Sequence, residues 1–255
     1  MSLLSRPSVI GVLAVGLVLA VPSLPLANHS WNGYHWARSA NPFTLELGDN
    51  VSLAWDGHLA TASSDWSQSS VLDTFVASGK AKSIKTCRPP VGRIEVCNSS
   101  YGNNGWLGVA QIWVSGGEHI TQGAVKLNDT YFNTPTYNSY AWRQLVACQE
   151  IGHTFGLDHQ DETFNNGNLG TCMDYTSDPS TNQHPNQHDY NQLEAIYAHL
   201  DSGTTSPSAR AGSGVDLDSP SEWGRLMKSS RGGRLQLFER DFGNGQRIVT
   251  FVFWA

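Results

Sequence analysis

The segment 148–161 reads CQEIGHTFGLDHQD and gathers polar side chains at spacings that suit a metal ion. Gln149 and His153 are four residues apart, so in a helix they lie about 40° apart around the axis and can face one ion together. Glu150 follows the first of them, where its carboxylate can take a proton from water beside the ion. The spacing therefore predicts a metal centre with a general base next to it.

Two further sequence features add a second histidine and a methionine to the predicted metal centre. Gly156 can adopt a left-handed conformation that ends the helix and turns the chain back, so that His159 reaches the same ion. Downstream, residues 171–175 read TCMDY, with Met173 at their centre. We therefore interpret the two segments as parts of one site.

These segments resemble the zinc-binding helix HExxHxxGxxH and the methionine turn of the metzincin proteases. Among that clan the chain is most similar to matrixin-like members, and the resemblance covers about residues 28–200. It implies that His153 and His159 are zinc ligands. It also implies that Glu150 is the general base and that Met173 is the turn methionine.

One position departs from the family pattern. Gln149 stands where the family has its first histidine ligand, and its amide oxygen is an uncharged, weaker donor to zinc than an imidazole nitrogen. Two interpretations stay open, a weak third ligand and a helix residue that does not bind the metal. Asp161, two residues past His159, is an alternative third ligand.

The resemblance implies a secreted zinc-dependent metalloendopeptidase. In that mechanism zinc lowers the pKa of a water molecule, Glu150 removes its proton, and the hydroxide attacks a peptide carbonyl. The substrate backbone would pair with an edge strand of the sheet, for which residues 107–113 are the candidate. The alternative is a catalytically impaired metzincin fold that acts as an extracellular binding protein. Gln149 favours this alternative, whereas Glu150 disfavours it.

Composition and charge narrow the class of partner. The chain has 255 residues, of which 39% are hydrophobic and 15% charged, which suits one globular catalytic domain with appendages. The formal net charge of −6 does not favour nucleic acid. We expect a peptide or protein substrate, and the sequence indicates no oligomeric state.

The beginning of the chain indicates export. Residues 9–21 form an uncharged apolar run, which predicts a secretory signal peptide over residues 1–27, with cleavage after Ala20, Ser23 or Ala27. An uncleaved membrane anchor is the alternative, although the run is shorter than the roughly 20 residues of a spanning helix. We therefore expect a secreted protein without stable membrane association after signal removal.

The four cysteines of an exported chain suggest two disulfides. Cys87 and Cys97 bracket a turn rich in proline and glycine, so we pair them. Cys148 directly precedes Gln149 and Cys172 directly precedes Met173, so a bond between these cysteines would hold the predicted helix to the methionine turn. A buried free thiol at Cys148 is the alternative.

The expected fold is α+β, with a zincin-like twisted mixed sheet, an active-site helix, a methionine turn, a closing helix and a C-terminal β-hairpin. The catalytic domain is expected over 28–201, a Gly/Ser/Thr/Pro-rich linker over 202–222 and the hairpin segment over 223–255. The hairpin should dock through Val249, Phe251 and Phe253, because two strands alone are marginal in water. The predicted strands are 43–47, 51–55, 93–96, 109–114, 124–127, 235–240 and 247–254, with a turn at 48–50 between the first two. The predicted helices are 139–155, with an N-cap at Asn138 or Ser139, and 187–200.

Overall fold

A computed structural model of the protein describes residues 29–205, 217–230 and 232–255. The predicted signal peptide and residues 206–216 of the predicted linker lie outside the described residues. Within the described part, the chain forms nine strands and four α-helices, a mixed α+β fold in which the sheet forms most of the core. None of the helices in this part is long and apolar enough to cross a membrane.

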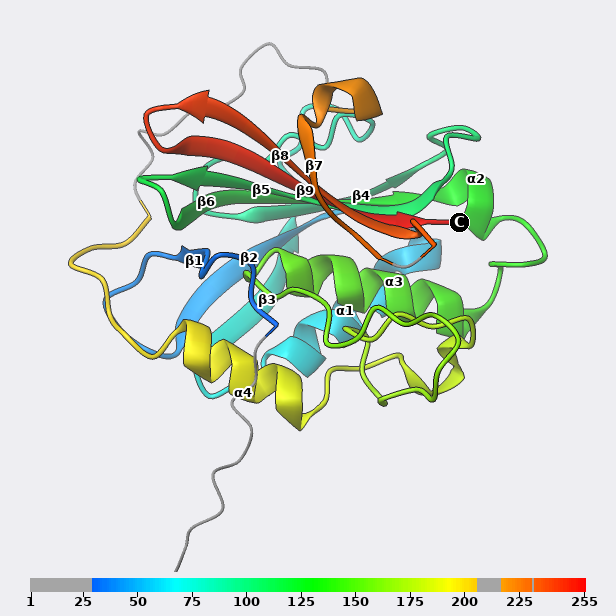
Figure 1. The fold of residues 1–255 in the computed structure, drawn as a ribbon, viewed down its shortest axis with the longest axis horizontal. Helices are drawn as coiled ribbons and strands as arrows, with labels where there is room; N and C mark the ends of the chain where they lie inside the picture. Colours follow the sequence, from blue (N-terminus) through cyan, green and yellow to red (C-terminus); the bar gives the residue numbers. More distant parts are fainter. Residues whose placement is uncertain (1–28, 206–216, 231) are drawn as a thin grey trace, which may run out of the picture.

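A single mixed sheet runs through the described part of the molecule (Figure 1). Its strands are β1 (His35–Trp36), β2 (Phe43–Asn50), β3 (Leu72–Ser78), β4 (Ile94–Ser99), β5 (Trp106–Ser115), β6 (His119–Asn128), β7 (Arg225–Ser229), β8 (Leu235–Gly243) and β9 (Gln246–Trp254). The spatial order is β3-β2-β4-β6-β5-β9-β8-β7, and β1 pairs with β6 outside this path. The pairs among β1, β2, β3, β4 and β6 are parallel. Every pair that includes β5, β7, β8 or β9 is antiparallel.

The helices α1 (Leu53–Trp66) and α3 (Tyr140–His153) lie under one face of the sheet, and α4 (Gln187–Ile196) lies further from it (Figure 1). A short helix α2 (Asp129–Phe132) follows β6. Ser139, one of the two N-caps predicted, caps α3, since its side chain accepts a hydrogen bond from the Trp142 N–H. The capping box at the start of α4 joins Asn186 and Asp189.

The predicted strand over 51–55 is wrong, and so is the predicted turn at 48–50. β2 continues through these turn residues because it pairs with parallel strands on both sides, β3 and β4. Gly48 fits there because a side chain would collide with Arg93 and Glu95. Residues 53–66 instead form α1, which buries Trp55 edge-on against Phe132.

The predicted C-terminal hairpin is confirmed as β8 and β9, and it is part of the main sheet. β9 pairs along β5, and β7 adds a further strand beyond β8. Val249, Phe251 and Phe253 are buried in the main core, as expected for a docked hairpin. Trp223 packs on Trp106 and Val252 in a smaller cluster, separate from the main core.

Both predicted disulfides are confirmed. Cys87 is bonded to Cys97, and Cys148 is bonded to Cys172. The second bond joins α3 to the segment that contains Met173, and all four cysteines are buried. Two disulfides are consistent with an exported protein.

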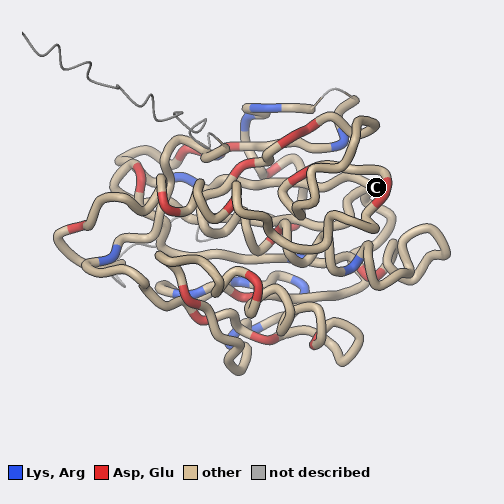
Figure 2. Tube along the Cα trace, turned by 90° about the horizontal axis from the view of Figure 1, so that it is seen from below, with Lys and Arg blue, Asp and Glu red and all other residues tan. Residues whose placement is uncertain are grey.

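Acidic residues and the less numerous basic residues are scattered along the described chain (Figure 2). Several of them form ion pairs between strands, for example Arg93 with Glu46 and Glu95. This pattern agrees with the modest net negative charge of the sequence.

Candidate metal centre

The two histidines of the motif meet just past the end of α3. His153 is the last residue of the helix, and its Nε2 atom lies 3.0 Å from Nε2 of His159. The Nδ1–H of His153 donates to the Leu157 carbonyl at 2.9 Å, which leaves a lone pair on Nε2. Burial lowers the pKa of His153 well below its usual value and so favours this neutral form. A proton or a metal ion is required between the two nitrogens, because facing lone pairs repel.

Gly156 produces the chain reversal that joins these histidines. Its φ angle is 95°, in the left-handed region predicted from the sequence. A side chain at Gly156 would also collide with the carbonyl oxygen of Tyr34. Both the backbone conformation and the close approach therefore require glycine at this position.

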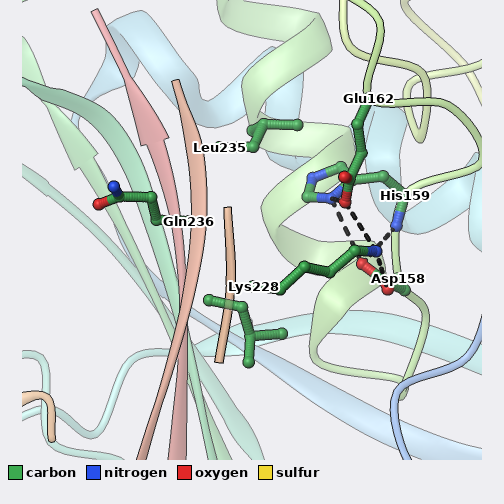
Figure 3. Close-up of a pocket in the computed structure, with 7 residues that line it drawn as sticks. Asp158, His159, Glu162, Lys228, Leu235 and Gln236 are labelled. Atoms are coloured by element: carbon green, nitrogen blue, oxygen red, sulfur yellow. Dashed lines mark hydrogen bonds and ion pairs between the residues drawn. The ribbon is translucent and has the colours of Figure 1, made fainter. Parts of the chain in front are cut away.

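Three charged residues that the sequence analysis did not select surround His159 (Figure 3). The His159 Nδ1 atom lies 3.4 Å from an Asp158 oxygen and 3.7 Å from a Glu162 oxygen. Although burial alone would lower the pKa of His159, these carboxylates raise it. Lys228 of β7 places its Nζ atom 2.7 Å from each carboxylate. Asp158 and Glu162 are close to the motif in sequence, but nothing local indicates Lys228.

Asp161, the alternative third ligand, is engaged elsewhere. Its Oδ1 atom accepts a hydrogen bond from the Thr163 N–H at 2.7 Å, and its other oxygen accepts from the side chain of Asn166. The structure therefore does not bring Asp161 to the histidine pair; Asp158 and Glu162 are the carboxylates beside His159.

Gln149 is fully buried one turn before His153. Its amide nitrogen donates to the carbonyl oxygen of Cys172 at 2.8 Å, which links α3 to the predicted methionine turn. Its Oε1 atom is buried and has no hydrogen-bond partner among the described residues. A buried carbonyl oxygen without a partner is costly, and a cation would satisfy it. This donor set fits a metal ion.

Glu150 lies between α3 and β5. Ala110 contributes a backbone hydrogen bond to its carboxyl group, whereas the Oε2 atom has no hydrogen-bond partner among the described residues. A Cβ atom at Gly108 would come within 2.6 Å of the other carboxyl oxygen, so glycine makes room for Glu150. Burial raises the pKa of Glu150 well above its usual value, because exclusion of water disfavours the charged carboxylate.

Met173 packs directly beneath the helix. A Cβ atom at Gly152 would lie 2.7 Å from the Met173 sulfur and 2.6 Å from the ring of Trp66. The absence of a side chain at Gly152 therefore allows this close contact. The Cys148–Cys172 disulfide and the Gln149 hydrogen bond join the same segment to α3.

The C-terminal strand covers this centre. The ring of Phe251 stacks on His153 with centroids 4.2 Å apart and planes at 6°, and Phe253 packs edge-on against Tyr175. The expectation that residues 107–113 form an open edge is wrong, because β9 pairs with β5 along this whole stretch. The backbone groups of β5 that would bind a peptide at a free edge are instead hydrogen-bonded to β9.

Two further groups of histidine and carboxylate side chains could hold a metal ion in the described part of the chain. One contains His29, His188 and Asp189, and the other contains His35, His119 and Asp201. The identity of the metal is not set by these residues alone. A scan against protein-family models finds no family that matches this chain, and a search of curated proteins finds no similar sequence, so the geometry of these sites is the basis for a functional conclusion.

Proposed function

We propose that the protein is a secreted zinc metalloendopeptidase of the metzincin type. His153 and His159 hold the zinc ion, and Glu150 is the general base. The observation that carries this proposal is the 3.0 Å separation of the two Nε2 atoms, with Glu150 one turn earlier on the same helix. The mixed sheet above α3 and the packing of Met173 beneath it support a metzincin-like fold.

Gln149 is the proposed third ligand. Its amide nitrogen already donates to Cys172, so the group that remains is the Oε1 atom, which has no partner among the described residues. An amide oxygen binds zinc more weakly than imidazole does, so we expect lower zinc affinity than three histidines would give. The hydrogen bond to Cys172 restricts the amide and reduces the entropy lost on binding.

The proposed reaction needs more space around Glu150 than the covered arrangement provides. Zinc at this place would act as a Lewis acid on the substrate carbonyl and would activate water. Glu150 would accept the proton and return it to the leaving amine, which requires a deprotonated carboxyl group. Moving β9 away from β5 would hydrate Glu150 and free a strand edge for a peptide. We therefore propose that the covered arrangement is a latent state of the enzyme.

A second candidate is an extracellular binding protein with the same fold. The stacking of Phe251 on His153 favours it, because no substrate can approach the histidine through that ring. The weak donor at Gln149 favours it as well. The retained carboxyl group of Glu150 favours the enzyme, because a binding protein has no need for a buried acid with one oxygen unpaired.

Peptide cleavage by variants with a loosened cover separates the two candidates. Phe251→Ala should expose the centre, and the zinc-loaded variant should cleave a diverse peptide library faster than wild type. Adding Glu150→Gln should keep the zinc and lower the rate on the order of 10² to 10⁴-fold. A folded, zinc-loaded Phe251→Ala variant that cleaves no peptide would favour the binding protein, and equal rates with and without Glu150→Gln would exclude Glu150 as the base.

The ligand assignment has its own test. His153→Ala should remove one equivalent of zinc from the purified protein, measured by elemental analysis, because it deletes one of only two imidazoles at the centre. Zinc content equal to that of wild type in folded His153→Ala would reject the assignment.

A further inference from the structure

Four side chains converge at a second place, where β1, the beginning of β6 and the segment after α4 come together. We propose that these residues form a separate zinc site with three imidazole ligands and one carboxylate ligand. The ligands are His35, His119, His199 and Asp201. This site requires neither the centre at α3 nor the proposed peptidase activity.

Four distances among the ligand atoms are close to those around a tetrahedral ion. Asp201 Oδ1 lies 3.2 Å from Nε2 of His119, 3.5 Å from Nε2 of His35 and 3.7 Å from Nε2 of His199. The Nε2 atoms of His35 and His199 are 3.2 Å apart. Tetrahedral zinc with bonds of about 2.0 to 2.1 Å separates neighbouring ligand atoms by about 3.3 to 3.4 Å. The ligand atoms of His35, His119 and Asp201 all lie within 4.8 Å of one another, and His199 approaches this group beside His35 and Asp201.

The hydrogen bond of His35 shows which nitrogen is available. Its Nδ1 atom is 2.7 Å from the carbonyl oxygen of Gly33, which can only accept, so Nδ1 carries the proton. The lone pair of Nε2 in neutral His35 then faces Asp201 Oδ1, which is also an acceptor. Two facing acceptors need a proton or a metal ion between them. A histidine held through Nδ1 by a backbone carbonyl is the usual arrangement of a metal ligand.

Arg38 holds Asp201 in the orientation that the site needs. The Oδ2 atom of Asp201 accepts from the Arg38 backbone N–H at 3.1 Å and from its guanidinium at 2.9 Å. This leaves Oδ1 for the three histidines. The same guanidinium donates to the backbone carbonyl of His199, so Arg38 positions two of the ligands without binding the ion itself.

The arrangement favours a structural ion that is reached from solvent. His35 is buried, whereas the side chains of His119 and His199 are 35% and 55% exposed, which leaves an entry path. Four protein ligands leave no open coordination position, as in structural zinc sites. The ligands come from three separate segments, and backbone hydrogen bonds from Asp201 and Thr205 to β1 and its extension already align two of them. Zinc would fasten these segments together.

The test compares zinc content among histidine variants of the full protein. The double variant His119→Gln/His199→Gln removes two exposed ligands and should lose one equivalent of zinc by elemental analysis. His184→Gln is the control, since the side chain of His184 is as exposed as that of His199 and pairs with Asp65 away from this cluster. The control should keep its zinc, and chelation should lower the Tm of the control more than that of the double variant.

Equal zinc content in wild type and a folded double variant would overturn the site. If the double variant does not fold, the single variant His199→Gln is tested instead, because it keeps the other three ligands and is less disruptive. It should weaken zinc binding at one site by at least about tenfold in a chelator competition, and an unchanged Kd would overturn the proposal. Neither measurement depends on peptide cleavage, so failure of the proposed function leaves this test intact.

Discussion

The two histidine centres of this protein are built in opposite ways. The centre at α3 comes from one short stretch of chain, is covered by Phe251, and offers only two imidazoles and an amide oxygen. The centre at Asp201 collects its ligands from distant segments, faces solvent and offers four strong donors. A local motif thus marks the weaker donor set. A catalytic zinc site keeps a coordination position open for water or substrate, whereas a structural zinc site fills all four positions with protein ligands. The two proposed centres differ in this way.

Removal of the aromatic cover should have the largest effect on this comparison. Phe251→Ala should destabilise the protein by about 3 to 5 kcal/mol, because it leaves a cavity in the core. It should also speed zinc release from the α3 centre in a chelator assay. Phe238→Ala is the control, since this partly buried ring packs on Trp223 in a separate cluster. Unchanged zinc release in Phe251→Ala would mean that the ring does not cover the metal.

The two disulfides should differ in their effect on the α3 centre although they contribute similarly to stability. Loop closure predicts a loss of about 3.5 kcal/mol for Cys148→Ser/Cys172→Ser and about 2.8 kcal/mol for Cys87→Ser/Cys97→Ser. Only the first pair holds α3 to the Met173 segment, so only that variant should bind zinc more weakly at α3. Denaturant unfolding and zinc titration check both statements. An equal loss of zinc affinity in the two variants would contradict the structural role assigned to the Cys148–Cys172 bond.

Replacing Gln149, the weakest proposed zinc donor, should bring the zinc affinity of the α3 centre closer to that of the centre at Asp201. Gln149→His replaces an amide oxygen by an imidazole nitrogen and should tighten zinc binding at α3 by at least about tenfold, or roughly 1.4 kcal/mol. Competition with a chromophoric chelator measures this change, and the centre at Asp201 is the internal control. Weaker binding at α3 would show that position 149 does not face the ion and serves only to hold Cys172.

The smallest effect is expected at Lys228, whose side chain is 37% exposed. Lys228→Ala removes the ion pairs with Asp158 and Glu162, and the cost should be on the order of 1 kcal/mol or less and should shrink with salt. Lys80→Ala is the control, because Lys80 pairs with Glu46 at 3.6 Å on a more exposed surface. A loss equal to that of the control would mean that these two ion pairs contribute no more than an ordinary surface pair.

The sequence predicted the features whose causes are local. The cap at Ser139, the left-handed turn at Gly156 and both disulfides follow from neighbouring residues, and all are present. Residues 53–66 were misjudged because this helix has weak apolar periodicity, and its burial depends on partners such as Phe132 that are distant in sequence.

The pairing partner of β9 and the cluster around Asp201 could not be predicted for the same reason. A hairpin is visible in sequence through its turn and its alternation, but the strand beside which it lies is set by tertiary packing. His35, His119 and His199 have no spacing that a motif could capture. Each resembles an ordinary polar residue until the chain has folded.

The pairing of β5 with β9 also affects the route to the native state. Gln111 and Thr250 meet across a sequence separation of 139 residues, so this part of the sheet depends on contacts between distant parts of the chain. Such contacts close slowly. Until β9 arrives, β5 exposes a long apolar edge on which a second copy of the chain can pair just as well. Refolding of this protein is therefore a competition between intramolecular closure and aggregation, and the yield should fall as the protein concentration rises.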